Sequence, residues 1–219
     1  PLPPGVIRLL VPLATLLGSW FIVQTYFEHS GRTISLRSWL GECMAAPGPP
    51  QPRYKCKNKR DCPADHFAFR IISGAANVVG PSICFEDRIL MSTVKNNIGR
   101  GLNIALVNGE LGPGGPKALY VTQLETFLQE IKDGTIVLVA TYDDAATKMN
   151  NKVQALFSAL GSRHVNQLGF RDNWVFLGAK GLKGKSPFEE HIKNDQKTNK
   201  YDGWPELLEM EGCAPRKQD

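Results

Sequence analysis

Short apolar runs, broken by glycine, asparagine or proline, are the feature of this sequence that most restricts its fold. Six such runs follow residue 54, and most are rich in β-branched or aromatic residues. They are HFAFRII (66–72), NVVGPSICF (77–85), RILMS (88–92), LNIALVN (102–108), TIVLVATY (135–142) and NWVFLGA (173–179). Runs this short, separated by turn-forming residues, are typical of β-strands. We therefore expect a sheet-based domain that begins near Tyr54.

Two segments between these runs show helical periodicity instead. The first starts with a capping box, Thr122 and Glu125, and ends before Gly134. Its apolar residues share one face: Leu124, Phe127, Leu128 and Ile131. The second runs from about Ala146 to a stop at Gly161. Strands alternating with two short helices predict an α+β sandwich in which the helices cover one or more sheet faces.

The N-terminal segment has the character of a membrane-directed sequence. Arg8 precedes LLVPLATLLGSWFIVQTYF, 19 uncharged residues interrupted by Pro12 and by the polar pair Gln24 and Thr25. These interruptions weaken a membrane span, so a cleaved signal peptide at residues 1–28 is favoured over a retained signal anchor. A Pro-rich linker, 29–53, then leads to the domain at 54–217.

Both interpretations of the N-terminus send the domain into an oxidising compartment, where cysteines form disulfides. The chain has five cysteines, and Cys43 is the odd one, in the linker. Neither a second closely spaced cysteine pair nor histidines at ligand spacing accompany Cys56 and Cys62, so a zinc site does not fit. With Cys84 and Cys213 these make four cysteines in the domain, and the sequence leaves all three connectivities open.

The net charge of +5 comes from the N-terminal part of the chain. Residues 1–63 hold eight basic and three acidic side chains, and the rest holds 18 of each. A domain that binds duplex nucleic acid normally has a basic face large enough to shift its own balance. The neutral domain therefore predicts no nucleic-acid partner.

No sequence pattern of a known catalytic site is present. The chain lacks a G-x-S-x-G elbow, an H-E-x-x-H pair, a P-loop and a full G-x-G-x-x-G. His66, His164 and His191 have no partners close by in the sequence. Asp143 and Asp144 follow a predicted strand and precede a predicted helix, so we interpret them as helix caps. We expect no enzyme activity, no catalytic residue, no metal and no cofactor.

Charged residues recur where predicted strands begin or end. They are Arg100, Asp144, Arg171 and Asp172, and Trp174 lies close to the last two. Arginine and carboxylate groups match vicinal hydroxyls, and an indole can stack on the apolar face of a sugar. The alternative is an internal Arg–Asp network with Trp174 in the core, which the residues alone favour.

Five long stretches cover most of residues 54–213: HFAFRIISGAANVVGPSICFED, VKNNIGRGLNIALVNG, DGTIVLVATYDDAATKMN, LGFRDNWVFLGAKGLKGKSPFEEHIKN and TNKYDGWPELLEMEGC. They closely resemble the secreted, cytokine-like family called family with sequence similarity three. The resemblance implies a β-β-α globular sandwich of two antiparallel sheets with short flanking helices. It also implies two disulfides, Cys56–Cys84 and Cys62–Cys213.

The same resemblance implies an extracellular, secreted signalling protein without enzyme activity, a monomer or weak dimer, linked to glucose metabolism and inflammation. Its expected partner is a cell-surface receptor, with membrane contact only through the N-terminal segment if that segment stays uncleaved. The family's segment after LNIALVN is longer than ELGPGGPKALYVTQLETFL (110–128) in this chain.

The domain also resembles the GG-type lectin module of a glycan-extending glycosyltransferase. This implies candidate sugar contacts at Arg100, Asp144 and Arg171, with Trp174 as a further candidate. A glycan is therefore the alternative partner. With this resemblance, sugar binding and an internal network become equal interpretations of the charged strand ends.

Overall fold

The computed structural model describes residues 15–22, 53–108, 117–118, 121–147 and 149–216. The chain divides into two units, 1–52 and 53–219. In the first unit, residues 15–22 form a short helix. Within the described residues, no helix combines the length and apolar character needed to cross a membrane. The rest of the expected signal segment, almost all of the linker and Cys43 lie outside the described residues, so these expectations stay predictions.

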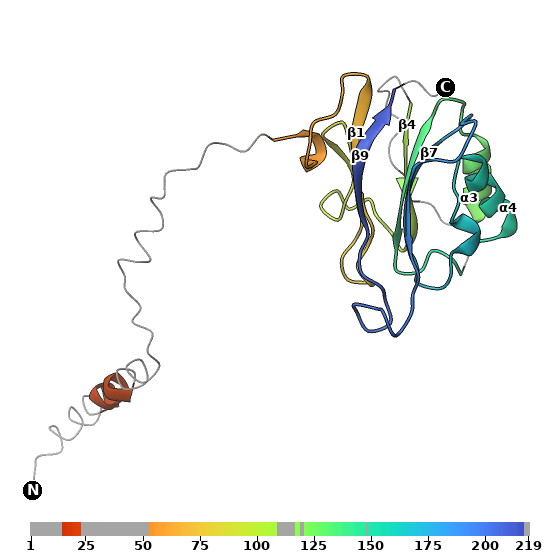
Figure 1. The fold of residues 1–219 in the computed structure, drawn as a ribbon. Helices are drawn as coiled ribbons and strands as arrows, with labels where there is room; N and C mark the ends of the chain where they lie inside the picture. Colours follow the sequence, from red (N-terminus) through yellow and green to blue (C-terminus); the bar gives the residue numbers. More distant parts are fainter. Residues whose placement is uncertain (1–14, 23–52, 109–116, 119–120, 148, 217–219) are drawn as a thin grey trace, which may run out of the picture. The chain divides into compact units, whose positions relative to one another are not determined.

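The second unit is built on two antiparallel sheets (Figure 1). The four-stranded sheet has the order β3 (Arg88–Met91), β2 (Ser82–Phe85), β1 (His66–Ile72), β9 (Glu209–Pro215). The five-stranded sheet has the order β5 (Lys117–Ala118), β4 (Gly101–Val107), β6 (Ile136–Tyr142), β7 (Asn173–Ala179), β8 (Phe188–Ile192). Neighbouring strands in both sheets run antiparallel.

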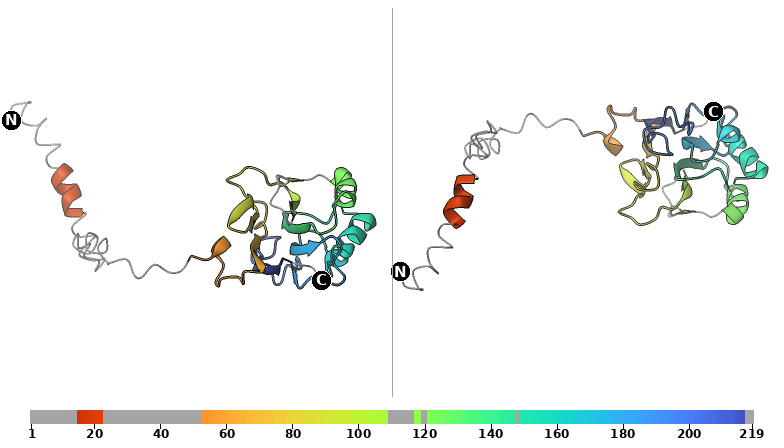
Figure 2. Two further views of the ribbon diagram at one scale, coloured as in Figure 1. Left: turned by 90° about the horizontal axis from the view of Figure 1, so that it is seen from above. Right: turned by 90° about the horizontal axis from the view of Figure 1, so that it is seen from below.

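Two helices, α3 (Val121–Gln129) and α4 (Asn151–Ala159), cover the outer face of the five-stranded sheet. Figure 2 shows the resulting order of layers: sheet, sheet, helices. Two single turns of 3-10 helix, η2 (Lys55–Lys57) and η3 (Val165–Gln167), complete the unit. The predicted α+β sandwich with a β-β-α arrangement is therefore confirmed.

The domain has two hydrophobic cores, one on each side of the five-stranded sheet. The core between the sheets includes Phe69, Ile83, Phe85, Leu138 and Val175. The core between the second sheet and the helices includes Leu124, Val139, Phe157, Trp174 and Phe176. Because β6 and β7 face a core on both sides, their sequences are continuously apolar rather than alternating.

The second helix starts later than its sequence pattern predicts. Asn150 is its N-cap, and the side-chain oxygen of Asn150 accepts a hydrogen bond from the N–H of Val153 at 2.9 Å. The predicted start near Ala146 is therefore wrong, because that segment forms a turn instead. The predicted stop is confirmed, since Gly161 follows the helix with a φ of 103°, a conformation that favours glycine.

Strands β5, β8 and β9 were not predicted by the apolar runs. β9 pairs with β1 along its whole length, and β8 pairs with β7. All three are edge strands, and the sequences of β8 and β9, FEEHI and EMEGCAP, carry glutamates. The predicted strand at 77–85 is shorter in the structure, because a turn closed by an Ala75–Val79 bridge occupies its first part.

The structure contains the two disulfides that the family resemblance implies. Cys56 is joined to Cys84, with 5.7 Å between their Cα atoms, and links the η2 turn to β2. Cys62 is joined to Cys213, with 5.5 Å between their Cα atoms, across 151 residues of sequence. The second disulfide ties strand β9 to the beginning of the domain.

Candidate functional site

Three strand ends of the five-stranded sheet meet at one end of the sandwich. Gly101 of β4 pairs with Tyr142 of β6, and β7 pairs with β6 in the register that sets Val175 opposite Ala140. This register brings Arg100, the Asp143–Asp144 pair and Arg171 to the same end of the sheet. We call this end, with the residues that contact it, the arginine rim.

Asp143 is the centre of the arginine rim. Its side chain is only 8% exposed, and one carboxylate oxygen lies 2.7 Å from Nε of Arg100. The other oxygen accepts a hydrogen bond from the indole N–H of Trp204 at 3.2 Å and lies 3.8 Å from Nε of Arg171. One buried carboxylate therefore joins the starts of β4 and β7 to the turn before β9.

Arg171 lies between two aromatic rings. The central carbon of its guanidinium is 3.8 Å from the ring centroid of Trp204 and 4.7 Å from that of Phe170. A Cβ on Gly203 would lie 3.1 Å from an Nη atom of Arg171, and Gly203 has a φ of 80°, so both space and backbone favour glycine there. The turn at 201–204 is thus shaped around the guanidinium.

Asp143 and Arg171 also share an unusual backbone conformation. Their φ angles are 58° and 60°, in the left-handed region that few residues other than glycine adopt. Such conformations cost roughly 1–3 kcal/mol each and persist where surrounding contacts fix them. Here the contacts among Asp143, Arg171 and Trp204 hold the two backbone conformations in place.

Asp144 is directed at its own turn and not at an arginine side chain. Its carboxylate accepts hydrogen bonds from the N–H groups of Ala146 and Thr147, each at 3.2 Å. Burial acts to raise the pKa of Asp144, but hydrogen bonds from Thr147 and from the backbone of Ala146 and Arg171 outweigh it, so the pKa is lowered. The prediction that Asp143 and Asp144 cap the helix is therefore wrong: Asp144 caps this turn, and the helix itself is capped by Asn150.

Asp172 is buried below the arginine rim and holds the surrounding loops. One of its oxygens accepts from the N–H of Gly169 at 2.8 Å and lies 2.7 Å from Nε2 of His191. The other accepts from the N–H of Asn194 at 2.8 Å. This residue therefore positions the segment that carries Arg171.

Trp174 lies in the core and has no exposed face. Its indole N–H donates to Glu189 at 2.9 Å, and its ring packs against Phe176 and Phe157. The indole at the rim is that of Trp204 instead. Sequence reasoning did not select Trp204, although its position between Gly203 and Pro205, outside any apolar run, was a usable signal.

Chemically, the rim is an ionic cluster with one cation open to solvent. Arg100 is 64% exposed, and its salt bridge to Asp143 is made through Nε. Within the described residues, no group of three or more histidine, cysteine or acidic side chains could hold a metal ion. The rim thus offers guanidinium donors and the partly buried carboxylate of Asp144.

Comparison with known proteins relates nearly the whole chain to one family. A domain model described as interleukin-like EMT inducer matches residues 100–182, which include Arg100, Asp143 and Arg171. Protein FAM3D of Homo sapiens is 55% identical over 223 residues, and that of Mus musculus 53% over 224, in each case 97% of both chains. Protein FAM3C of Homo sapiens is 50% identical over 229 residues, 98% of both chains.

The chain belongs to the FAM3 family. This is the family with sequence similarity three that the five long stretches resemble, so that prediction is confirmed. The segments GVIRLL and TISLRSWL look most like member D, and two of the relatives named above are FAM3D proteins. As a FAM3 chain, it is a cytokine-like protein.

Proposed function

We propose that this FAM3 chain is a secreted signalling protein that acts through a cell-surface receptor and regulates metabolism or inflammation. The observation that carries the proposal is the relation to FAM3D and FAM3C proteins over nearly the full length of the chain. The two disulfides support an extracellular site of action, because such bonds persist in oxidising compartments. The proposal involves no catalysis.

The face proposed to contact the receptor, the receptor face, includes the arginine rim and two neighbouring loops, 74–80 and 92–98. The hydroxyl of Tyr142, the residue before Asp143, donates to the carbonyl of Asn77 at 2.8 Å and so fixes the 74–80 loop beside the rim. This loop exposes 80% of Val78, and Val94 in the adjoining loop is 97% exposed. Exposed apolar side chains grouped beside charged ones are typical of protein interaction sites.

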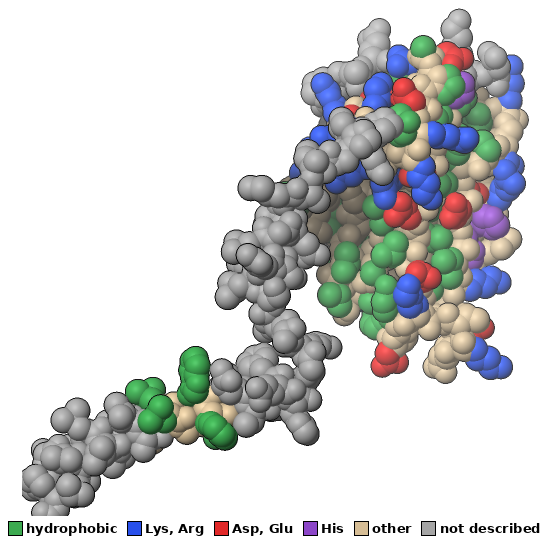
Figure 3. All heavy atoms as spheres, turned by 60° about the vertical axis from the view of Figure 1, so that its left-hand side comes forward, with side chains coloured by type: hydrophobic (Ala, Val, Ile, Leu, Met, Phe, Trp, Pro, Cys, Tyr) green, Lys and Arg blue, Asp and Glu red, His purple; other side chains and the backbone are tan. Residues whose placement is uncertain are grey.

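Figure 3 supports this choice of face. In that view, hydrophobic side chains group in the lower half of the sandwich, while lysine and arginine side chains dominate the upper half. The Gly80 backbone lies against the 92–98 segment, since a Cβ there would be 2.9 Å from Oγ1 of Thr93. The two loops that carry the exposed valines therefore form one continuous surface.

The proposal is tested by expressing the full chain in mammalian cells. We expect the disulfide-bonded domain in the culture medium, and we expect the purified protein to bind cells saturably and to change their signalling. Retention of the chain inside the cells would contradict secretion. Secreted protein that neither binds cells nor alters their signalling would contradict a receptor-mediated function.

A second candidate function is carbohydrate binding at the arginine rim. It is favoured by the exposed guanidinium of Arg100 and the half-buried Asp144 at the same end of the sheet, a donor and an acceptor suited to sugar hydroxyls. A glycan array is the direct measurement, with Arg100→Ala, Arg171→Ala and Asp144→Ala as variants. Binding that survives all three substitutions would contradict this site, and absence of binding by the unmodified protein would contradict the lectin function.

A further inference from the structure

One segment at the start of the domain concentrates basic side chains. Residues 53–60, RYKCKNKR, contain five basic residues and no acidic one, and we call this segment the basic strip. All five basic side chains are exposed: Arg53, Lys55, Lys57, Lys59 and Arg60. The residues between the first four, Tyr54, Cys56 and Asn58, are half-buried or buried. The strip, orange in Figure 1, thus turns its charges to solvent on the side of the four-stranded sheet away from the helices.

The backbone of the basic strip is fixed by contacts around Lys57. Cys56 is joined to β2 by its disulfide, and the side-chain amide of Asn58 donates to the carbonyl of Gly212 at 3.3 Å. The carbonyl of Lys57 accepts a hydrogen bond from Nη1 of Arg70 at 2.8 Å. A partner that binds here therefore orders side chains but not the chain itself, which lowers the entropic cost of binding.

The carboxylates around the basic strip bind backbone N–H groups. Asp87 accepts from the N–H of Cys56 at 3.1 Å, and Glu211 accepts from the N–H of Lys59 at 3.0 Å. Asp61, which follows the strip, accepts from the N–H of the next residue at 3.0 Å. These three acidic side chains therefore hold the backbone of the segment in place rather than neutralise its side chains one by one.

Most cations of the basic strip have no ionic partner. Within the described residues, Lys55 is its one side chain in a salt bridge, with 2.7 Å between Nζ and a carboxylate oxygen of Glu86. The side chains of Lys57, Lys59 and Arg60 form neither a salt bridge nor a hydrogen bond in this part of the chain. Three neighbouring exposed cations are therefore free to bind an anion outside the protein.

The basic strip offers charge without an apolar surface. No large apolar side chain is exposed among residues 53–60, and the aromatic ring of Tyr54 is half-buried. Helices that bind membranes place apolar side chains beside their cations, and sites for single-stranded nucleic acid present aromatic rings on which bases stack. The strip therefore fits a polyanion that is recognised through its charged groups alone.

We propose that the basic strip binds sulfated glycosaminoglycan chains of the cell surface or the extracellular matrix. Lysine- and arginine-rich runs of this length are typical of heparin-binding patches. Oxyanions such as sulfate accept short, strong hydrogen bonds from ammonium and guanidinium groups. The proposal rests on secretion, which is part of the proposed function, because a secreted protein meets these polymers.

The basic strip is separate from the arginine rim. It contacts the turn after β2 through Asp87, whereas the 74–80 loop beside the rim precedes β2. The second candidate function places neutral sugar hydroxyls at the rim, so the two sites differ in position and in the charge of the ligand. A glycosaminoglycan on the strip thus leaves the receptor face open to a receptor.

The test measures retention of the purified full chain on immobilised heparin at an ionic strength of about 0.15 M. We expect retention, and elution as the salt is raised, because cations that bind a polyanion release its condensed counterions. Soluble heparin should displace the protein, and heparin stripped of its sulfates should not. Passage without retention, or equal displacement by the two polymers, would overturn the proposal. Retention of purified protein does not depend on secretion or on a receptor, so this result is separate from the test of the proposed function.

A triple variant, Lys57→Gln with Lys59→Gln and Arg60→Gln, tests the free cations. We expect its affinity for heparin to fall at least about tenfold, since three contacts to the polyanion are lost. The matched control makes the same change in charge at three exposed lysines elsewhere: Lys132→Gln, Lys183→Gln and Lys197→Gln. This control should bind as the unmodified protein does. Equal affinities of the two triple variants would overturn the strip as the binding site.

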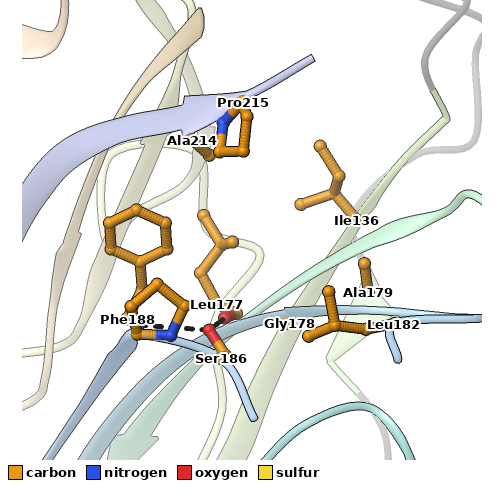
Figure 4. A pocket seen from close by; sticks show the side chains of 10 residues that line it. Ile136, Leu177, Gly178, Ala179, Leu182, Ser186, Phe188, Ala214 and Pro215 are labelled. Atoms are coloured by element: carbon orange, nitrogen blue, oxygen red, sulfur yellow. Dashed lines mark hydrogen bonds between the residues drawn. The ribbon is translucent and has the colours of Figure 1, made fainter. Parts of the chain in front are cut away.

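NMR locates the contact in the unmodified protein. A heparin-derived oligosaccharide should shift the amide signals of the basic strip and leave those of the apolar pocket lined by Ile136, Leu182 and Phe188 unshifted (Figure 4). None of the described residues that line this pocket is charged, and the hydroxyl of Ser186, its one polar side chain, donates to the carbonyl of Leu177. Shifts at the arginine rim without shifts in the strip would overturn the proposal. Equal shifts with vesicles of anionic phospholipid or with single-stranded RNA would overturn the choice of partner.

Discussion

The guanidinium of Arg171 and the indole of Trp204 lie in contact, with 3.8 Å between the guanidinium carbon and the ring centroid. The indole N–H of the same Trp204 donates to Asp143, whose carboxylate also lies near Arg171. Three side chains from three separate connections thus hold one another in place. They fix the end of the sandwich that we propose as the receptor face.

This contact predicts an energetic coupling between Arg171 and Trp204. A cation over an aromatic ring contributes about 0.5–2 kcal/mol, depending on how far it is removed from solvent. We expect Arg171→Gln and Trp204→Leu each to lower the free energy of unfolding, and the double variant to lower it by less than the sum of the two. Urea unfolding of the four proteins measures the coupling, and strictly additive losses would contradict it.

Asp143→Asn tests the carboxylate at the centre of the rim. Asparagine tolerates the left-handed backbone and keeps an acceptor for Trp204, but it removes the charge between the two arginines. We expect a loss of about 1–3 kcal/mol in the free energy of unfolding, and a larger loss for Asp143→Ala. Asp202→Asn, an exposed position in the neighbouring turn, is the matched control and should change stability little. Equal effects at both positions would argue against the network.

The two disulfides should differ in how much they stabilise the domain. In the chain-entropy model, closing 151 residues with Cys62–Cys213 contributes roughly 5 kcal/mol and closing 28 residues with Cys56–Cys84 roughly 3.5 kcal/mol. Replacing each pair with alanine should therefore lower the free energy of unfolding more for Cys62–Cys213. The opposite order in urea unfolding would show that strand β9 is held mainly by its pairing with β1.

Glu86 should make stability depend on pH in the acid range. Its burial acts to raise the pKa, but the contacts with Lys55 at 2.7 Å and with the N–H of Ala68 at 2.8 Å outweigh this, so the pKa lies below its ordinary value of 4.5. A lowered pKa means that Glu86 stabilises the fold fully above pH 4.5 and progressively less as the pH falls through the lowered pKa.

The measurement is urea unfolding of the unmodified protein and of Glu86→Gln across this range. We expect the stability difference between them to be large at pH 7 and to shrink below pH 4.5. A difference that stays constant with pH would contradict the lowered pKa.

The parts of the fold that the sequence predicts are those in which one physical signal dominates. The bounds of β1 and β7 match their apolar runs, because charged or polar residues flank strands that bury most of their side chains. β8 and β9 are edge strands with charged or half-exposed residues, so their sequences resemble loops. Their place in the sheets is set by tertiary pairing, which no local pattern contains.

The candidate site was predictable to the level of strand ends but not of individual contacts. Asp143 and Asp144 have the same chemistry and neighbouring positions, and only the backbone turn decides which one faces Arg100. The sequence likewise does not tell which of Trp174 and Trp204 lies at the rim. Trp174 is buried because the helices cover one face of β7, and no local pattern around Trp174 contains that information. Residue types were enough to locate the rim, but the individual side-chain contacts depend on the folded backbone.

The central claim is that the protein binds a cell-surface receptor through the receptor face. Its most direct test compares saturable cell binding by the Val94→Asp and Lys132→Gln variants of the secreted protein. Both substitutions lower the net charge by one at an exposed position, but only Val94 lies on the proposed receptor face. We predict that Val94→Asp weakens saturable cell binding at least tenfold, while Lys132→Gln binds as the unmodified protein does. Equal binding by the two variants would contradict the account.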